Sequence, residues 1–206
     1  MTIHAVRRSS VQVREEILRA AESVFSEKGY ASATSRDLAK AAGVSESVLY
    51  RHFGSKSGLF AEAMVTPFIH VLDAFSALSA RTMAQPLDVE TLMRLFLSEL
   101  IEQLSAHRQT IRMFLAAEDQ LDTETRASFY DRFHSVMTRL SEATGEESHR
   151  RQRPQGPLGP DMNVRATMGM VLSLVVFDDW LLRPEPHRPS REQLIEHLGT
   201  MLLHGT

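Results

Sequence analysis

The chain has 206 residues, enough for one domain with a substantial core or for a small domain fused to a larger one. Its composition, 43% hydrophobic and 24% charged, is ordinary for a globular protein, and the lack of cysteine excludes disulfides and thiolate metal sites. The longest apolar run, residues 171–177, is too short to span a bilayer, and no apolar stretch of a secretory signal follows the N-terminal arginines. We therefore expect a cytoplasmic protein that does not contact a membrane.

Charge is unevenly distributed along the chain. The net charge is −3 for the whole sequence, but residues 1–60 contain nine Lys and Arg against six Asp and Glu. The remaining residues contain fourteen basic and twenty acidic side chains. A mildly basic head on an acidic body is typical of a DNA-contacting module joined to a separate second domain.

The first quarter of the chain predicts short helices with defined ends. An apolar stripe at helical spacing ends before Gly29. Thr34, with Asp37 three residues later, is typical of a capping box at the start of a second helix. Gly43 ends that helix, and Ser45 is the N-cap candidate of the next one. The segment therefore predicts two short helices that meet at a tight turn.

A fourth helix is predicted to begin at Lys56, with Ser55 as its N-cap. Pro67 interrupts the apolar pattern that follows. A proline inside a helix removes a hydrogen bond and kinks it, but Thr66-Pro67 also fits the N-cap and first position of a new helix. Both interpretations predict a bend near residue 66.

The rest of the chain has helical periodicity with one interruption. Residues 144–161 are rich in Gly, Pro and Arg and predict a flexible connection that is basic in its middle. No strand signal and no repeat is found, so the predicted fold is all-α with about nine helices. The later helices are predicted over residues 88–106, 108–117, 121–143, 162–183 and 190–204.

The segment 29–56 resembles the N-terminal signature of the TetR family of transcriptional regulators. The similarity covers roughly residues 13–60. It implies a three-helix DNA-binding domain with a helix-turn-helix over residues 1–57, and a larger helical ligand-binding and dimerisation domain over 58–206. The matching positions are Gly29, Tyr30, Thr34, Asp37, Ala39, Ala42, Gly43, Val44, Ser45, Leu49, Tyr50, Phe53, Ser55 and Lys56.

The resemblance, together with helix geometry, assigns roles to the exposed positions. Side chains of the first turn of the second helix reach base edges in the major groove, and Glu46 can accept a hydrogen bond from a cytosine amino group. Tyr50 and His52 resemble the family's phosphate-contacting pair, and Arg51 can reach a guanine or a phosphate. The predicted DNA contacts are Thr34, Arg36, Ser45, Glu46, Ser47, Tyr50, Arg51, His52 and Lys56.

Departures from the signature leave the DNA target open. Ser47 and Val48 replace residues that are usually Gly and Thr or Ser, and both lie where bases are read. Ala33 replaces a Thr, Ser35 an apolar residue, and Ser57-Gly58 a Glu-apolar pair.

Some of these residues also have an alternative interpretation that involves no contact with DNA. Glu46 is equally well explained as a solvated carboxylate, and His52 as a packing residue. Arg7 and Arg8 fit either an arm that follows the minor groove or an ordinary charged tail.

The second domain supplies candidates for a dimer seam and a ligand pocket. A single helix-turn-helix reads few bases, so specific binding to a palindrome calls for two copies. The dimer candidates on the last two helices are Met168, Val171, Leu172, Val175, Leu194, Leu198 and Leu202. The ligand candidates, which fit core filling as well, are Phe96, Met113, Phe114, Tyr130, Phe133, His134, Met137 and Trp180.

Asp178 and Asp179 are two adjacent carboxylates inside an apolar helix. They either face solvent or arginine partners, or bind a cationic group of a ligand. No metal site and no cofactor is predicted.

The leading hypothesis is a homodimeric repressor that binds a palindromic operator and is released by an unidentified, largely apolar small molecule. The alternative is a ligand-independent DNA-binding regulator or an activator. A helical enzyme is the third hypothesis, and the sequence argues against it because it contains no zinc-protease motif, nucleophile elbow, phosphate loop or dinucleotide fingerprint.

Overall fold

The computed structural model describes residues 9–153, 157–184 and 186–204. Within these ranges the chain is helical and contains no strand, as the sequence predicts. The chain divides into two compact units, one formed by residues up to Phe68 together with Arg112–Phe129, the other by Ile69–Ile111 and the residues from Tyr130 onward. The functional boundary predicted after residue 57 stays a prediction.

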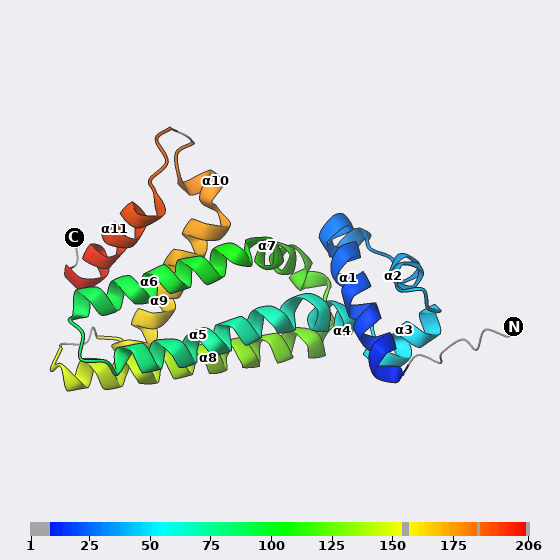
Figure 1. The fold of residues 1–206 in the computed structure, drawn as a ribbon, viewed down its shortest axis with the longest axis horizontal. Helices are drawn as coiled ribbons and strands as arrows, with labels where there is room; N and C mark the ends of the chain where they lie inside the picture. Colours follow the sequence, from blue (N-terminus) through cyan, green and yellow to red (C-terminus); the bar gives the residue numbers. More distant parts are fainter. Residues whose placement is uncertain (1–8, 154–156, 185, 205–206) are drawn as a thin grey trace, which may run out of the picture. The chain divides into compact units, whose positions relative to one another are not determined.

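The first unit is built around the N-terminal helices (Figure 1). Gly29 has a positive φ of 72° and interrupts the helical backbone of α1, where the sequence predicts that the first helix ends. The aromatic rings of Phe25, Tyr30 and Phe60 form the centre of this unit, with centroids 5.0 to 6.0 Å apart. Its elements are α1 (Ser10–Ser32), α2 (Ser35–Ala42), α3 (Glu46–Phe53), α4 (Lys56–Phe60), a π-helical segment (Ala61–Val65), a 3₁₀ turn (Glu118–Gln120) and the start of α8 (Thr123–Arg150).

The second unit contains helices that pack in pairs. In it, α6 contacts both α9 and α11, and Arg139 of α8 donates to Asp73 of α5, so that α5 and α8 lie side by side (Figure 1). Its core contains Leu97, Leu100 and Val171, all fully buried. The remaining elements are α5 (Thr66–Met83), α6 (Val89–Ala106), α7 (Arg108–Ala117), α9 (Gly159–Val176), α10 (Asp178–Leu181) and α11 (Arg191–His204).

The predicted flexible connection over 144–161 is wrong in its first half, because α8 continues to Arg150. Glu147 forms ion pairs with Arg150 and Arg151, three and four residues later, and such pairs stabilise a helix. Gly145 lies within α8 beside Pro160, at the start of α9, and a Cβ atom at position 145 would lie 3.3 Å from the Pro160 ring. Residues 154–156 lie outside the described ranges.

The helix predicted over 162–183 begins earlier and is divided. Pro160 occupies the first turn of α9, where its missing N–H costs nothing. Phe177, with φ −109° and ψ 27°, separates α9 from the short α10.

A π-helical segment, Ala61–Val65, directly precedes residue 66, where the sequence predicts a bend. Thr66 has helical φ and ψ of −60° and −44°, so the N-cap interpretation of Thr66-Pro67 is wrong. The Thr66 N–H instead reaches back to the carbonyl of Ala61, five residues earlier. Since Pro67 has no N–H and its ring crowds the preceding turn, a widened turn before it accommodates the proline within one helical run.

The helical run Lys56–Met83 is long and apolar enough to cross a membrane, but the core helices of globular proteins can have the same length and composition. Its large apolar residues Leu59, Phe60, Ile69 and Leu72 are each no more than 1% exposed. We therefore interpret it as a core helix.

Candidate nucleic-acid interface and effector cavity

The turn between α2 and α3 has the geometry that the sequence predicts. Gly43 adopts the left-handed conformation, with φ 63° and ψ 35°, and its N–H bonds to the carbonyls at the end of α2. The Val44 N–H reaches the Ala39 carbonyl at 3.0 Å, which completes a glycine C-cap. Ser45 then caps α3 by accepting from the Val48 N–H. Two helices thus meet at a three-residue turn, as in a helix-turn-helix.

Buried contacts fix α3 on the rest of the first unit. Leu49 and Phe53 are the buried residues of α3, and Leu38 and Ala39 of α2 are buried as well. The guanidinium of Arg14, from α1, lies 5.1 Å from the centre of the Phe53 ring. The inner face of α3 is therefore held rigidly, and its other face is available to a partner.

The first turn and outer face of α3 expose most of the residues there that are predicted to contact DNA. Ser45, Glu46, Ser47, Tyr50 and Arg51 are all exposed. The hydroxyl oxygens of Ser45 and Ser47 are 2.8 Å apart, so these two side chains are hydrogen-bonded to each other. The first turn of α3 therefore presents two paired hydroxyls and one carboxylate. His52 is half-buried, which is compatible with either packing or a phosphate contact.

The N-terminus of α2 is closed by the predicted capping box of Thr34 and Asp37. The Thr34 hydroxyl accepts from the Asp37 N–H and donates its one hydrogen to the Asp37 carboxylate, 2.8 Å away. The hydroxyl thus has no hydrogen left to donate to a phosphate in this conformation, and the DNA contact predicted for Thr34 stays a prediction.

Asp37 is held ionised by its neighbours. The Thr34 side chain, the Lys28 ammonium at 3.1 Å and the Thr34 backbone lower the pKa of the Asp37 carboxyl to about 2. The carboxylate therefore serves the capping box at every physiological pH.

Ser35 and Tyr50 join the two helices of the motif. Their hydroxyl groups are hydrogen-bonded to each other, although the residues are 15 positions apart. The bond places the Tyr50 hydroxyl beside the N-terminus of α2, where Arg36 is also exposed. The predicted phosphate contacts from α2 and α3 are thus brought together. The sequence marks Ser35 only as a departure from the family signature.

Lys56 lies at the first position of α4 with its ammonium over an aromatic ring. The Nζ atom is 4.3 Å from the centre of the Tyr30 ring, and partial burial lowers the pKa of Lys56. The Tyr30 hydroxyl is 2.8 Å from the Ser57 hydroxyl in the interior. The departure at Ser57 therefore has a structural role, since a hydroxyl there pairs with the tyrosine that supports Lys56.

Asp122, a residue that the sequence analysis missed, connects α4 with the start of α8. Its carboxylate accepts from the Ser55 hydroxyl at 2.9 Å and from the Thr125 N–H at 2.8 Å. Its own N–H donates to the Ser57 hydroxyl at 3.2 Å. Hydrogen bonds from Thr125 and Ser55 lower the pKa of Asp122. In the sequence, an Asp at the start of a predicted helix is an N-cap candidate, and this is the signal that could have identified Asp122.

Sequence comparison relates the segment that contains the helix-turn-helix to a known family. Residues 17–63 match the profile of bacterial regulatory proteins of the tetR family. Over this N-terminal segment, the chain is similar to the tetR family. Among curated relatives, it is 30% identical over 121 residues to the HTH-type transcriptional repressor AcnR of Corynebacterium efficiens, covering 59% of this chain and 58% of AcnR. It is 44% identical over 68 residues to the nucleoid occlusion factor SlmA of Vibrio campbellii, covering 29% of this chain and 35% of SlmA.

The chain therefore spans less than two thirds of the length of these relatives. By name, AcnR is a transcriptional repressor and SlmA a nucleoid occlusion factor, and neither name is that of an enzyme.

Solved structures extend the similarity of the fold to nearly the whole chain. A tetR-family regulator from Mesorhizobium loti matches with a TM-score of 0.71 and 19% identity, covering 95% of each chain. FadR of Bacillus subtilis, solved in complex with stearoyl-CoA, matches with a TM-score of 0.61 and 18% identity, covering 93% of this chain and 98% of FadR. The all-α fold is thus that of tetR-family regulators.

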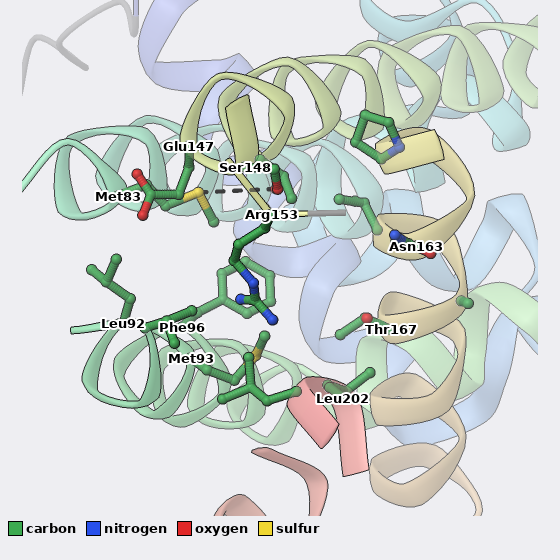
Figure 2. Close-up of a pocket in the computed structure, with 16 residues that line it drawn as sticks. Met83, Leu92, Met93, Phe96, Glu147, Ser148, Arg153, Asn163, Thr167 and Leu202 are labelled. Carbon is green, nitrogen blue, oxygen red and sulfur yellow. Dashed lines mark hydrogen bonds between the residues drawn. The ribbon is translucent and has the colours of Figure 1, made fainter. Parts of the chain in front are cut away.

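The second unit contains a cavity of about 450 Å³ (Figure 2). This volume lies within the range of small-molecule sites, about 300–1,000 Å³. Figure 2 shows side chains converging on it from the end of α5, from α6, α8 and α9, and from α11. Its apolar lining residues are Met83, Val89, Leu92, Met93, Phe96, Pro160, Val164, Ala166, Leu202 and Leu203, and its polar ones are Thr144, Glu147, Ser148, Arg153, Asn163 and Thr167.

Most of the predicted ligand contacts do not line this cavity. Of those eight, Phe96 lines it and Met137 is buried in the core. Trp180 is 83% exposed, and its ring stacks on Phe177 with centroids 5.3 Å apart. Tyr130 and His134 are exposed and Phe133 is half-buried, while Met113 and Phe114 belong to the first unit. Sequence periodicity identified apolar faces, but it could not show which of them enclose space.

The predicted dimer residues fall into two groups. Met168, Val171 and Leu198 are at most 4% exposed within the single chain, so they are core residues and do not present a surface to a partner. Leu172, Val175, Leu194 and Leu202 are half-buried and remain candidates, although Leu202 also lines the cavity.

The Asp178-Asp179 pair has arginine partners. The Asp178 carboxylate is buried and forms ion pairs with Arg108 and Arg188. Asp179 is exposed and pairs with Arg108 at 2.9 Å. Of the interpretations left open by the sequence, arginine pairing is the one observed, and it joins the start of α7 to α10 and the loop before α11.

Proposed function

We propose that the protein is a transcriptional repressor that binds a palindromic operator as a homodimer and is released by a small molecule. The observation that carries the proposal is the outer face of α3, which exposes Glu46, Ser47, Tyr50 and Arg51 on a helix whose inner face is buried. A rigid short helix with exposed polar side chains fits the major groove.

The homodimer follows from what one such helix can read. Eight residues of α3 contact only a few base pairs, so useful specificity requires a second copy about 34–36 Å away along the duplex. A two-fold dimer reads a palindrome. The half-buried residues on α9 and α11 are the surfaces we assign to the partner.

Repression and release are supported by the relatives and by the cavity. AcnR is named a repressor, and FadR was solved with stearoyl-CoA. A ligand that binds one conformation better than another shifts the population toward it, which is how an effector would weaken DNA binding. The match to SlmA covers only about a third of each chain, so nucleoid occlusion is not proposed.

The test is DNA binding by the full chain. Operator fragments selected from genomic DNA, including the region upstream of its own coding sequence, are titrated by fluorescence anisotropy at several salt concentrations. We expect a palindromic site whose affinity falls steeply with salt. Arg51→Ala should weaken binding by about 1–3 kcal/mol, or lower the salt slope by about one if it contacts a phosphate.

Arg81→Ala is the matched control, because Arg81 is an exposed arginine of α5 in the second unit. If Arg51→Ala and Arg81→Ala behave alike, α3 does not read the DNA.

Sedimentation of the complex reports whether two chains bind one site. Deleting the gene should raise transcription next to the operator, and a fall would identify an activator.

A further inference from the structure

Arg153 places a positive charge in the apolar cavity of the second unit. Its backbone N–H donates to the Ser148 carbonyl at 2.9 Å, just beyond the end of α8. Figure 2 shows its side chain pointing into the cavity toward Phe96. Within the described ranges, its guanidinium group makes no ion pair and no side-chain hydrogen bond. An arginine presents five donors, so this fork is available to a ligand.

The neighbouring arginines differ from Arg153 because their guanidinium groups already form ion pairs within the protein. Arg150 and Arg151 both form ion pairs with Glu147, and Arg151 also donates to the Leu87 carbonyl. Glu147 is buried and lines the same cavity. Its negative charge is thus already matched by two guanidinium groups, and Arg153 is left as the cation of the cavity.

The surroundings of Arg153 define the remainder of the ligand. Met93, Phe96 and Leu202 form an apolar wall opposite α9, from which Asn163 and Thr167 point toward the cavity (Figure 2). A guanidinium group beside apolar surface gains most from an anion that pairs with its fork and fills the apolar space. One guanidinium group matches one negative charge, so a second charge on the ligand would be buried without a partner.

We propose that this cavity binds a small amphipathic monocarboxylate. The carboxylate pairs with the Arg153 guanidinium, and the apolar body lies against Phe96, Met93 and Leu202. The inference rests on the proposed function in one respect, since it names the chemical class of the effector. Binding itself can be measured without DNA.

The experiment is calorimetric titration of the full chain with matched probes. Decanoate and phenylbutyrate carry a carboxylate, decanol and phenylbutanol carry the same bodies without charge, and decyl phosphate carries a larger charge. We expect each carboxylate to bind about ten- to a hundredfold more tightly than its alcohol. Equal binding of acid and alcohol, no binding of either acid, or preference for decyl phosphate would overturn the proposal.

Two variants test the role of the arginine. Arg153→Gln should remove the preference for the acid and leave alcohol binding unchanged, and Arg153→Lys should restore part of it, because lysine keeps the charge without the fork. Arg165→Gln is the control, since Arg165 pairs with Asp161 at 2.8 Å and does not line the cavity. Circular dichroism checks that all three fold. An undiminished preference in Arg153→Gln would show that the cation of the site lies elsewhere.

A DNA-binding arm separates the two proposals. If an acid binds in an Arg153-dependent way but does not weaken operator binding, the monocarboxylate site stands and effector release is wrong. If operator binding is released by another compound while neither acid binds, release stands and the assignment of the ligand class is wrong.

Discussion

At the scale of single residues, several polar side chains of the motif are already committed within the protein. Thr34 and Asp37 satisfy each other at the start of α2, and the Ser35 hydroxyl is bonded to Tyr50. These bonds reduce the side-chain entropy that a complex with DNA would otherwise cost. We infer that Tyr50 is positioned before DNA arrives.

The capping box makes the stability of the first unit depend on pH. The pKa of Asp37 is lowered from 3.8 to about 2 in the folded chain. Since the folded pKa is the lower one, the stabilisation is complete above pH 4 and is lost as the pH falls toward 2. Asp37→Asn should therefore lower the thermal unfolding midpoint at neutral pH, and the difference from wild type should close over that acid range.

Asp119→Asn, at an exposed carboxylate of the 3₁₀ turn, is the control for a general effect of removing a charge. A difference between wild type and Asp37→Asn that stayed constant down to pH 2 would show that ionisation of Asp37 does not contribute.

Gly58 is a second residue-scale constraint. A Cβ atom at this position would collide with the backbone carbonyl oxygen of Phe53. Gly58→Ala should therefore destabilise the chain by about 1–3 kcal/mol, although alanine is the better helix former. Denaturant unfolding measures this. Gly169→Ala provides the contrast, because no atom lies within 4 Å of its added Cβ. It should be neutral or stabilising by up to about 1 kcal/mol.

At the scale of elements, the π-helical segment before Pro67 bears on the proposed release of DNA. Such segments are a strained alternative to the α-helix and often occur at functional sites. Here the segment Ala61–Val65 follows α4, whose first residue is Lys56. A change from π to α spacing would rotate α4 relative to the helix that follows.

Replacing Pro67 tests this idea. Pro67→Ala restores a backbone donor and allows regular α-helical spacing. We expect effector-induced release of DNA to change more than the affinity of the effector-free protein, measured by anisotropy with and without effector. His70→Ala, at an exposed position one turn later in α5, should change neither quantity. Unchanged release and affinity in Pro67→Ala would exclude a hinge at this position.

Elements with strong local signals could be predicted from the sequence. The capping residues and Gly43 located α2 and α3, and the helices over 89–106 and 108–117 follow their predicted ranges closely. The errors lie where tertiary contacts override composition. Ion pairs of Glu147 extend α8 into a segment rich in glycine and arginine, and arginine pairing of Asp178 accompanies the division of a continuous apolar pattern.

The candidate sites differ in how far sequence could predict them. The positions predicted to contact DNA follow from the family resemblance and from helix geometry, and the structure exposes most of them. The cavity arises where five helices meet, which no local pattern encodes, and Arg153 belonged to a segment predicted to be a loop. Phe96 was the one predicted ligand residue that lines it.

At the scale of the whole molecule, the Asp178 cluster joins distant segments of the second unit. Asp178 is 11% exposed in its side chain and bridges Arg108 and Arg188. Asp178→Asn should reduce the free energy of unfolding by about 1.5–3 kcal/mol, because it leaves two guanidinium groups without their shared carboxylate. Asp179→Asn should cost less than about 1 kcal/mol, since that carboxylate is exposed. Equal losses in urea unfolding would contradict the assigned difference.

The exposed indole of Trp180 gives the protein an intrinsic fluorophore. It is the chain's one tryptophan, and at 83% exposure most of its surface contacts solvent, so its emission should lie at long wavelength. It is carried by α10, directly after the helix that supplies part of the proposed dimer surface. If two chains associate through that region, the emission maximum should shift to shorter wavelength as protein concentration rises. Assembly could then be followed in the unmodified protein, without a label.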